Sequence, residues 1–445
     1  MANETALPES AEGAQGLTRA LGAWGLGTSI FNTVVGAGIF VLPATLAREV
    51  GGAAPLVYLA CAVAMGGVAW CFAAAGSRAP TSGGPAGYVE AAFGPLAGFV
   101  VGVLIWLGAV LAAAGIAAAI ADNLAHLLPS IGHGGGRSAF IVALLGTLAV
   151  INIAGVKPGV RLVGIMTVAK LLPLLILLTA GAAFIRMEHF SAPAAPGITG
   201  SGATGFGRAM ILALFAFQGM ETALSLSGEV RRPARNVPLG LLGAMGAVTV
   251  LYIAIQIVAQ GVLGPALGHS NTPLADAAAS ISPPLGRLLL AGAAISMLGY
   301  LSSDALSAPR LLYTFARQGL LPKALAQVSS VTSAPFAAIL LHASLAVALA
   351  LSGSFAELAT LSSLTTVVVY IAGCVAAVVL QRRGIATAGP PLQAKGLLLA
   401  AIVGVAGMVW LLIHAKAIEA IGLVGTLAIS AGWYALARAL KKTRP

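Results

Sequence analysis

Long apolar stretches separated by short polar segments dominate this sequence. Of its 445 residues, 59% are hydrophobic and 8% are charged, with a mean hydropathy of +0.98. Soluble proteins carry about 25% charged residues, so we expect an integral membrane protein. A spanning helix needs about 20 mostly apolar residues. We therefore predict an all-α protein with twelve transmembrane helices, at residues 21–47, 53–76, 95–121, 139–156, 160–185, 206–228, 238–263, 285–309, 334–352, 356–380, 396–414 and 418–438.

Glycine interrupts the first predicted span, within Thr28-Ser-Ile-Phe-Asn-Thr-Val-Val-Gly-Ala-Gly-Ile-Phe40. Each unpaired backbone N–H or C=O in hydrocarbon costs several kcal/mol, so a broken spanning helix indicates partners for the freed groups. An exposed helix N-terminus suits a carboxylate, and exposed C-terminal carbonyls suit an ammonium group. Val34, Gly36, Ala37 and Gly38 are therefore predicted to bind a zwitterion such as an α-amino acid. The alternative is that these small residues only allow close helix packing.

The sixth span repeats this irregularity, because Gln218, Gly219 and Glu221 interrupt its apolar centre. Two broken helices five spans apart predict two inverted repeats of five helices, with the binding site where the repeats meet. The first repeat covers residues 21–186 (helices 1–5), and the second covers 206–381 (helices 6–10). Helices 11 and 12 follow at 394–440, and the tails are residues 1–20 and 441–445.

Three charged side chains lie well inside predicted spans, away from the span ends. Glu221 lies near the predicted bilayer midplane, where a carboxylate is costly and indicates a proton carrier or a partner for a cationic group. Alternatively, a protonated Glu221 only bonds to nearby backbone. Lys170 is predicted to replace a metal ion at a helix interface and to couple protonation to transport; the alternative is that its amine snorkels toward the cytoplasm. For Asp304, six residues before Arg310, a functional and a hydrated structural role are both open.

Several function classes are excluded or unsupported by the sequence. The net charge of +11 comes from Lys and Arg that fall mostly on one side of the predicted topology, which places both termini in the cytoplasm and removes the need for a nucleic-acid partner. No phosphate-binding loop is present, and the three cysteines and the histidines lack metal-ligand spacing. We therefore predict no cofactor, no metal, no catalytic residues and no enzymatic activity.

The motifs along the chain resemble those of the amino acid–polyamine–organocation transporter superfamily. The resemblance rests on six segments in order: Val35–Phe40 with Leu42-Pro-Ala44, Pro80–Tyr88, Gly155–Leu171, Phe215–Glu221, Glu229–Pro238 and Arg310–Pro322. It implies the five-plus-five inverted-repeat fold and alternating access. By similarity to arginine–agmatine antiporters, Gly36, Ala37 and Gly38 with Ala216 and Gly219 would bind substrate, Phe215 would form an aromatic gate, and Glu221 would be proton-sensitive. Lys170 matches a lysine of proton-coupled members.

Two departures from the antiporters concern substrate choice. Ile105 and Asp304 stand where the antiporters carry aromatic residues, so strict arginine–agmatine exchange is not expected. We predict a plasma-membrane transporter of amino acids, proton-coupled or exchanging, whose partners are the substrate, protons and lipid. Its oligomeric state, monomer or homodimer, is left open. Two alternatives remain: a polyamine or organic-cation antiporter with Glu221 as counter-charge, and a non-transporting membrane receptor with the same fold.

Overall fold

The computed structural model describes residues 21–81, 83–125, 128–155, 160–191, 203–332, 334–387 and 390–442. Sixteen α-helices occur in these ranges, and the described residues contain no β-strand. The predicted tail 1–20, most of the tail 441–445 and the basic residue Lys157 lie outside the described residues.

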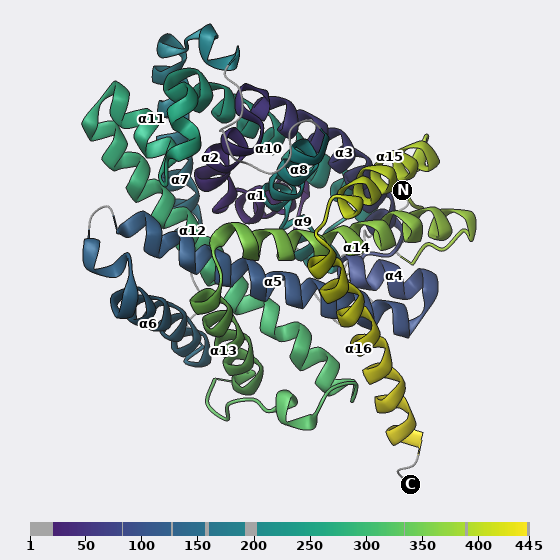
Figure 1. Cartoon of the computed structure of the whole chain (residues 1–445). Helices are drawn as coiled ribbons and strands as arrows, with labels where there is room; N and C mark the ends of the chain where they lie inside the picture. The colour runs from purple at the N-terminus through teal and green to yellow at the C-terminus, as the bar shows by residue number, and fades with distance from the viewer. Residues whose placement is uncertain are drawn as a thin grey trace, which may run out of the picture.

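Eleven of the helices are long, and together they build the body of the molecule (Figure 1). They are α3 (Ala54–Arg78), α5 (Pro95–Leu124), α6 (Gly134–Ile153), α7 (Val160–Gly181), α8 (Ala203–Phe217), α10 (Pro233–Leu263), α12 (Pro283–Arg317), α13 (Phe336–Ser352), α14 (Phe355–Arg382), α15 (Leu397–Ile413) and α16 (Ala417–Lys442). The shorter helices are α1 (Ala23–Val34), α2 (Gly38–Val50), α4 (Pro85–Phe93), α9 (Met220–Ala223) and α11 (Pro273–Ile281).

The prediction of an all-α membrane protein is confirmed. Within the described ranges, eight helices are long and apolar enough to cross a membrane, and three shorter helices are also apolar. Each of the twelve predicted spans contains helix, although their ends shift by several residues. The helices α4 and α11 were not predicted; both begin with proline, which is favoured in the first turn because it lacks an N–H group.

Both predicted breaks are present as interruptions in the helical backbone. Residues 35–37 separate α1 from α2, and residues 218–219 separate α8 from α9. A short parallel bridge joins Leu21, just before α1, to Val230, which follows the end of the second broken segment. The two discontinuous helices are therefore tied together at this end as well as at their breaks.

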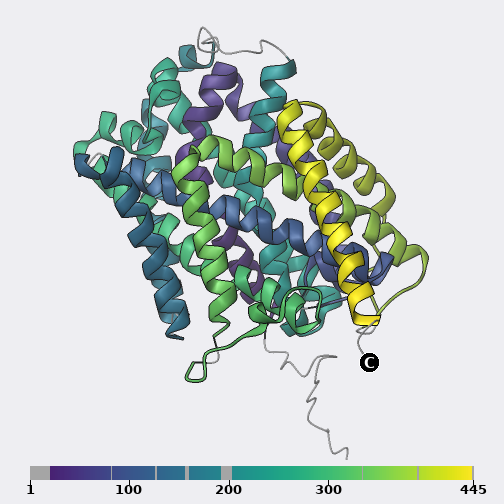
Figure 2. The same cartoon turned by 60° about the horizontal axis from the view of Figure 1, so that its bottom comes forward.

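The remaining helices surround the broken pair. Among the helix pairs in contact are α1 with α9, α2 with α8, α3 with α10, α5 with α12, and α6 with α13. Each of these pairs joins two elements that are five predicted spans apart in the chain. Figure 2 shows α15 and α16, in yellow-green and yellow, along one edge of the molecule and α6, in blue, at the opposite edge.

Candidate functional site

The first break places backbone donors and acceptors at the centre of the bundle. The N–H of Val35 still donates to the carbonyl of Phe31 at 2.9 Å, and the N–H of Gly36 turns to the carbonyl of Val34 at 2.8 Å. A new helix then begins at Gly38. The first N–H groups of a helix have no acceptor within it, so this start is a ready site for a negative group.

The second break depends on a backbone conformation that favours glycine. Gly219 has φ = +111°, in the left-handed region, and ends α8 before the single turn of α9. A Cβ atom added to Gly219 would lie 3.0 Å from the side chain of Thr33 and 3.1 Å from its carbonyl oxygen. Gly219 is therefore required both for the turn and for the close approach of the first broken helix.

Tyr252 of α10 joins the two breaks. Its buried hydroxyl lies 2.8 Å from the carbonyl oxygen of Val34 and 2.9 Å from that of Ala216. Beside it, a Cβ atom on Gly38 would meet the Cα of Ala216 at 2.8 Å. The glycine allows the two broken helices to touch, and the tyrosine holds their terminal carbonyls at a fixed separation.

Lys170 reaches the first break from α7. Its Nζ donates hydrogen bonds to the carbonyls of Asn32 and Val35, each at 2.7 Å, and the residue is 4% exposed. The hydroxyl of Ser296 on α12 lies 3.3 Å from the carbonyl oxygens of Val35 and Gly36. The amine therefore lies where it neutralises the carbonyl-rich end of α1.

Glu221 is buried against the second break. Gly219 donates its N–H to both carboxyl oxygens, at 3.0 and 3.1 Å, and the hydroxyl of Tyr370 donates to Oε2 at 2.7 Å. These contacts match the alternative in which Glu221 bonds to nearby backbone. Its role in proton coupling stays a prediction.

A small cavity, here called the site cavity, lies between the two breaks. It encloses room for about one water molecule, so an amino acid needs its walls to move apart. Its lining residues come from five helices and both breaks: Thr33, Val34, Gly36, Ala37, Gly38, Ala112, Ile116, Phe215, Gln218 and Tyr300. The amide of Gln218 is fixed by Ser363 at 3.0 Å and Ser362 at 2.9 Å, both on α14.

An aromatic pair separates the site cavity from a wider vestibule. Phe215 lines the site cavity, and its ring meets that of Phe355 edge-on with centroids 5.4 Å apart. Phe355 in turn lines the vestibule, together with Val41, Ala44, Thr45, Arg48, Ala119, Asp122, Ala125, Gly132, His133, Ser270, Asn271, Ser354 and Ala356. Phe215 is thus positioned as one half of a thin barrier.

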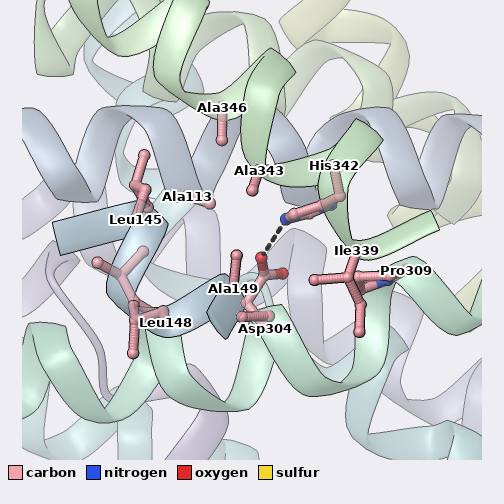
Figure 3. Close-up of a pocket in the computed structure, with 12 residues that line it drawn as sticks. Ala113, Leu145, Leu148, Ala149, Asp304, Pro309, Ile339, His342, Ala343 and Ala346 are labelled. Carbon is pink, nitrogen blue, oxygen red and sulfur yellow. Dashed lines mark hydrogen bonds and ion pairs between the residues drawn. The ribbon is translucent and has the colours of Figure 1, made fainter. Parts of the chain in front are cut away.

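Two predicted candidates lie elsewhere. Asp304 lines a separate pocket with His342, shown in Figure 3, and Ile105 is not among the residues of the site cavity. Tyr300, one turn before Asp304 on α12, and Ala112 and Ile116 of α5 line the cavity instead. Sequence reasoning missed Tyr252, Tyr300, Tyr370 and Ser296, because nothing in the local sequence distinguishes them from packing residues.

Replacing Tyr252 by phenylalanine is expected to weaken the link between the breaks. The single hydroxyl proton that the two buried carbonyl oxygens share is lost, at a cost of about 1–3 kcal/mol. We expect thermal unfolding at lower temperature and reduced substrate uptake. Tyr58→Phe, in the same aromatic cluster, is the control, and equal effects of the two variants would contradict the bridging role.

Comparison with known proteins gives consistent matches along the chain. The amino acid permease family profile matches residues 21–429. Over 391 residues the chain is 26% identical to a methylthioribose transporter of Bacillus subtilis, covering 82% of each protein. It is 27% identical over 382 residues to the serine/threonine exchanger SteT of the same organism, covering 83% of this chain and 84% of the relative. The vacuolar cationic amino acid transporter 2 of Arabidopsis thaliana is 26% identical over 365 residues, covering 78% of this chain and 57% of the relative.

These relatives are permeases and transporters, not enzymes. The profile covers both breaks, the helices that line or contact them, and the residues around Lys170. With its multiple apolar helices, the chain is a multi-pass membrane protein that belongs to the amino acid permease family.

Proposed function

We propose that this protein is a secondary active transporter that moves small neutral amino acids across the plasma membrane by alternating access. The observation that carries the proposal is the site cavity, where the start of α2 and the ends of α1 and α8 converge. The substrate carboxylate binds the free N–H groups at Gly38 and Ile39. The ammonium group binds the carbonyls at the ends of α1 and α8.

The cavity lining supports a small, uncharged side chain. Ala112, Ile116, Phe215 and Tyr300 offer apolar contacts, and Gln218 offers one fixed amide. No carboxylate belongs to this lining, and the oxygens of Glu221 are already bonded to Gly219 and Tyr370. A polyamine with Glu221 as counter-charge therefore receives less support than a neutral amino acid. The serine/threonine exchanger among the relatives agrees with this substrate class.

In the proposed alternating access, one barrier closes each side of the site cavity, and the two barriers open in turn. Phe215 and Phe355 form the thin barrier toward the vestibule, which the charge distribution assigns to the outside. On the opposite side, the bridge from Leu21 to Val230 joins the two broken helices. Helix contacts between elements five spans apart support two inverted repeats, 21–186 and 206–381, that move against each other. Both termini are then cytoplasmic.

Lys170 is the proposed coupling residue. A charged amine donates to the carbonyls of Asn32 and Val35 and stabilises the conformation seen in this structure, in which the site cavity is closed. A neutral amine holds these carbonyls less strongly, so proton release favours movement of α1. Protonation of Lys170 would thereby accompany each transport cycle.

Uptake into proteoliposomes tests the proposed function. Labelled serine, threonine and alanine are offered with and without a pH gradient, and with and without internal substrate. Arginine, putrescine and methylthioribose serve as competitors. We expect saturable uptake of at least one neutral amino acid. No saturable uptake across the panel would contradict transport, and inhibition by putrescine but not by amino acids would favour the organic-cation alternative.

A further inference from the structure

The transport site does not use a second buried pair of titratable groups. His342 Nε2 on α13 lies 3.0 Å from Asp304 Oδ2 on α12, and their side chains are 5% and 6% exposed (Figure 3). Such a pair is costly to bury, and removal of one partner is strongly destabilising because it leaves a buried charge uncompensated. Its presence inside an apolar bundle therefore calls for a function.

The surroundings of the pair are apolar. The other residues of its pocket are alanine, leucine, isoleucine and proline from α5, α6, α12 and α13. Figure 3 shows Ala113, Leu148 and Ile339 around the hydrogen-bonded pair. Among the described side chains, Nδ1 of His342 is buried without a hydrogen-bond partner. The imidazole thus carries a polar atom that is open to a proton or to a single water molecule, for which the pocket has room.

No other charge in the pocket competes with the pair. The charged groups on the elements packed against α12 lie outside this pocket. Lys170 bonds to the first break, Asp276 bonds to Ser270 and Thr272, and Asp122 pairs with Arg137. Lys323 is exposed. Tyr300, one turn from Asp304, is the neighbouring titratable group and lies within electrostatic range of it. Asp304 and His342 are therefore the two ionisable residues in the lining of this pocket.

The pocket of the pair has a neighbouring pocket at the Arg310 end of α12. A crevice there is lined by Asn152, Leu306, Arg310 and Ile339, among others. Ile339 also lines the pocket of the pair. One side chain is thus shared by the crevice and the pocket, on the side assigned to the cytoplasm by the charge distribution.

The helix that carries Asp304 also forms part of the transport site. Ser296, Tyr300 and Asp304 are spaced four residues apart, so they follow one side of α12. Ser296 bonds to the first break and Tyr300 lines the site cavity. Pro309 lines the pocket of the pair, and a proline inside a helix removes one backbone hydrogen bond and permits bending. The attachment of α12 to α13 is therefore linked mechanically to the site.

We propose that Asp304 and His342 form a proton-binding site that sets the position of α12, an inference that rests on the proposed transport function for its physiological meaning. With the proton bound, the ion pair holds α12 against α13, as described here. Loss of the proton leaves the carboxylate of Asp304 without a counter-charge in an apolar pocket, which favours movement of α12 and admission of water from the crevice. Tyr300 and Ser296 move with the helix and alter the site cavity.

Two measurements that need no substrate test this proposal. Histidine labelled with ¹⁵N follows protonation of the chain's six histidines by NMR, and His342→Gln identifies the signal of His342. Spectra are recorded between about pH 5 and 8, where histidine side chains change charge. We expect the protonation state of His342 to change with pH and to respond differently in Asp304→Asn. An unchanged protonation state across this range would overturn proton binding.

The second measurement reports the position of α12. A cysteine introduced by Leu306→Cys lines the crevice, while the three native cysteines are buried. The rate at which maleimide labels this cysteine is measured with the native Asp304–His342 pair and again with Asp304→Asn/His342→Gln, in which the pair cannot bind a proton. The first rate is divided by the second. We expect this ratio to rise about tenfold from pH 5 to pH 8, within the usual range of coupling between sites. A flat ratio would overturn the link to α12.

A matched control separates this site from other histidines. His269→Gln replaces an exposed histidine and should leave the labelling ratio unchanged. Absence of uptake by the native protein would overturn the proposed function but not these two results, so the two failures are distinguishable.

Discussion

Replacing Lys170 by methionine is expected to abolish most of the pH dependence of uptake while leaving substrate binding within about threefold. Methionine fills a similar space but removes the donor to the carbonyls of Asn32 and Val35. A hydrogen bond to a charged group contributes about 1.5–3 kcal/mol, so the described conformation loses more than a factor of ten relative to its alternatives. Binding should change less, because Lys170 is not part of the site cavity lining.

The measurement is uptake and binding of the same labelled amino acid at several values of pH. The sign follows from the contacts: a protonated amine stabilises the described conformation at low pH, and this stabilisation fades as pH rises and the proton leaves. In Lys170→Met the rate should be low, and only the pH dependence that the Asp304–His342 pair contributes should remain. Lys323→Met, which replaces an exposed lysine, is the control. Unchanged pH dependence in Lys170→Met would exclude coupling through this residue.

Replacing Gly38 by alanine is expected to reduce uptake by on the order of 100-fold, because a displacement of about 1 Å at a binding site can cost that much. The new Cβ would lie 2.8 Å from the Cα of Ala216 and 3.0 Å from its Cβ, so the two broken helices must separate. This separation pulls apart the two carbonyls that share the Tyr252 hydroxyl and displaces the N–H groups at the start of α2.

The control for this variant is Gly66→Ala on α3, where a new Cβ meets nothing within 4 Å. Elution and thermal unfolding of both variants in detergent establish that they are folded. Near-native uptake by Gly38→Ala would show that close contact of the two breaks is not needed, and would favour a packing role for the glycines.

Local features of the sequence predicted the fold class and the location of both breaks. Hydrophobic length identifies spanning helices because the bilayer core imposes it on every helix, and Gly36, Gly38 and Gly219 interrupt otherwise continuous apolar runs. Lys170 and Glu221 were also found locally, because a charge within an apolar span is conspicuous. The structure brings both to the breaks.

Other members of the site could not be predicted in the same way. Tyr252 and Tyr300 have the composition of ordinary packing residues, and their contacts join elements far apart in the chain; Tyr252 is 218 residues from Val34. Asp304 looked equivalent to Lys170 in the sequence, yet α12 directs it to His342 on α13. The direction of a side chain around a helix depends on which neighbour that helix packs against.

The sequence by itself determined that this chain is a helical membrane protein with two interrupted helices, because hydrophobic length and glycine act locally on the backbone. Only the tertiary structure decided which groups meet at those interruptions. Tyr252 joins the two breaks, Lys170 neutralises one of them, and Asp304 belongs to a separate pair. These contacts depend on how helices distant in the sequence pack and face one another, which local composition does not encode.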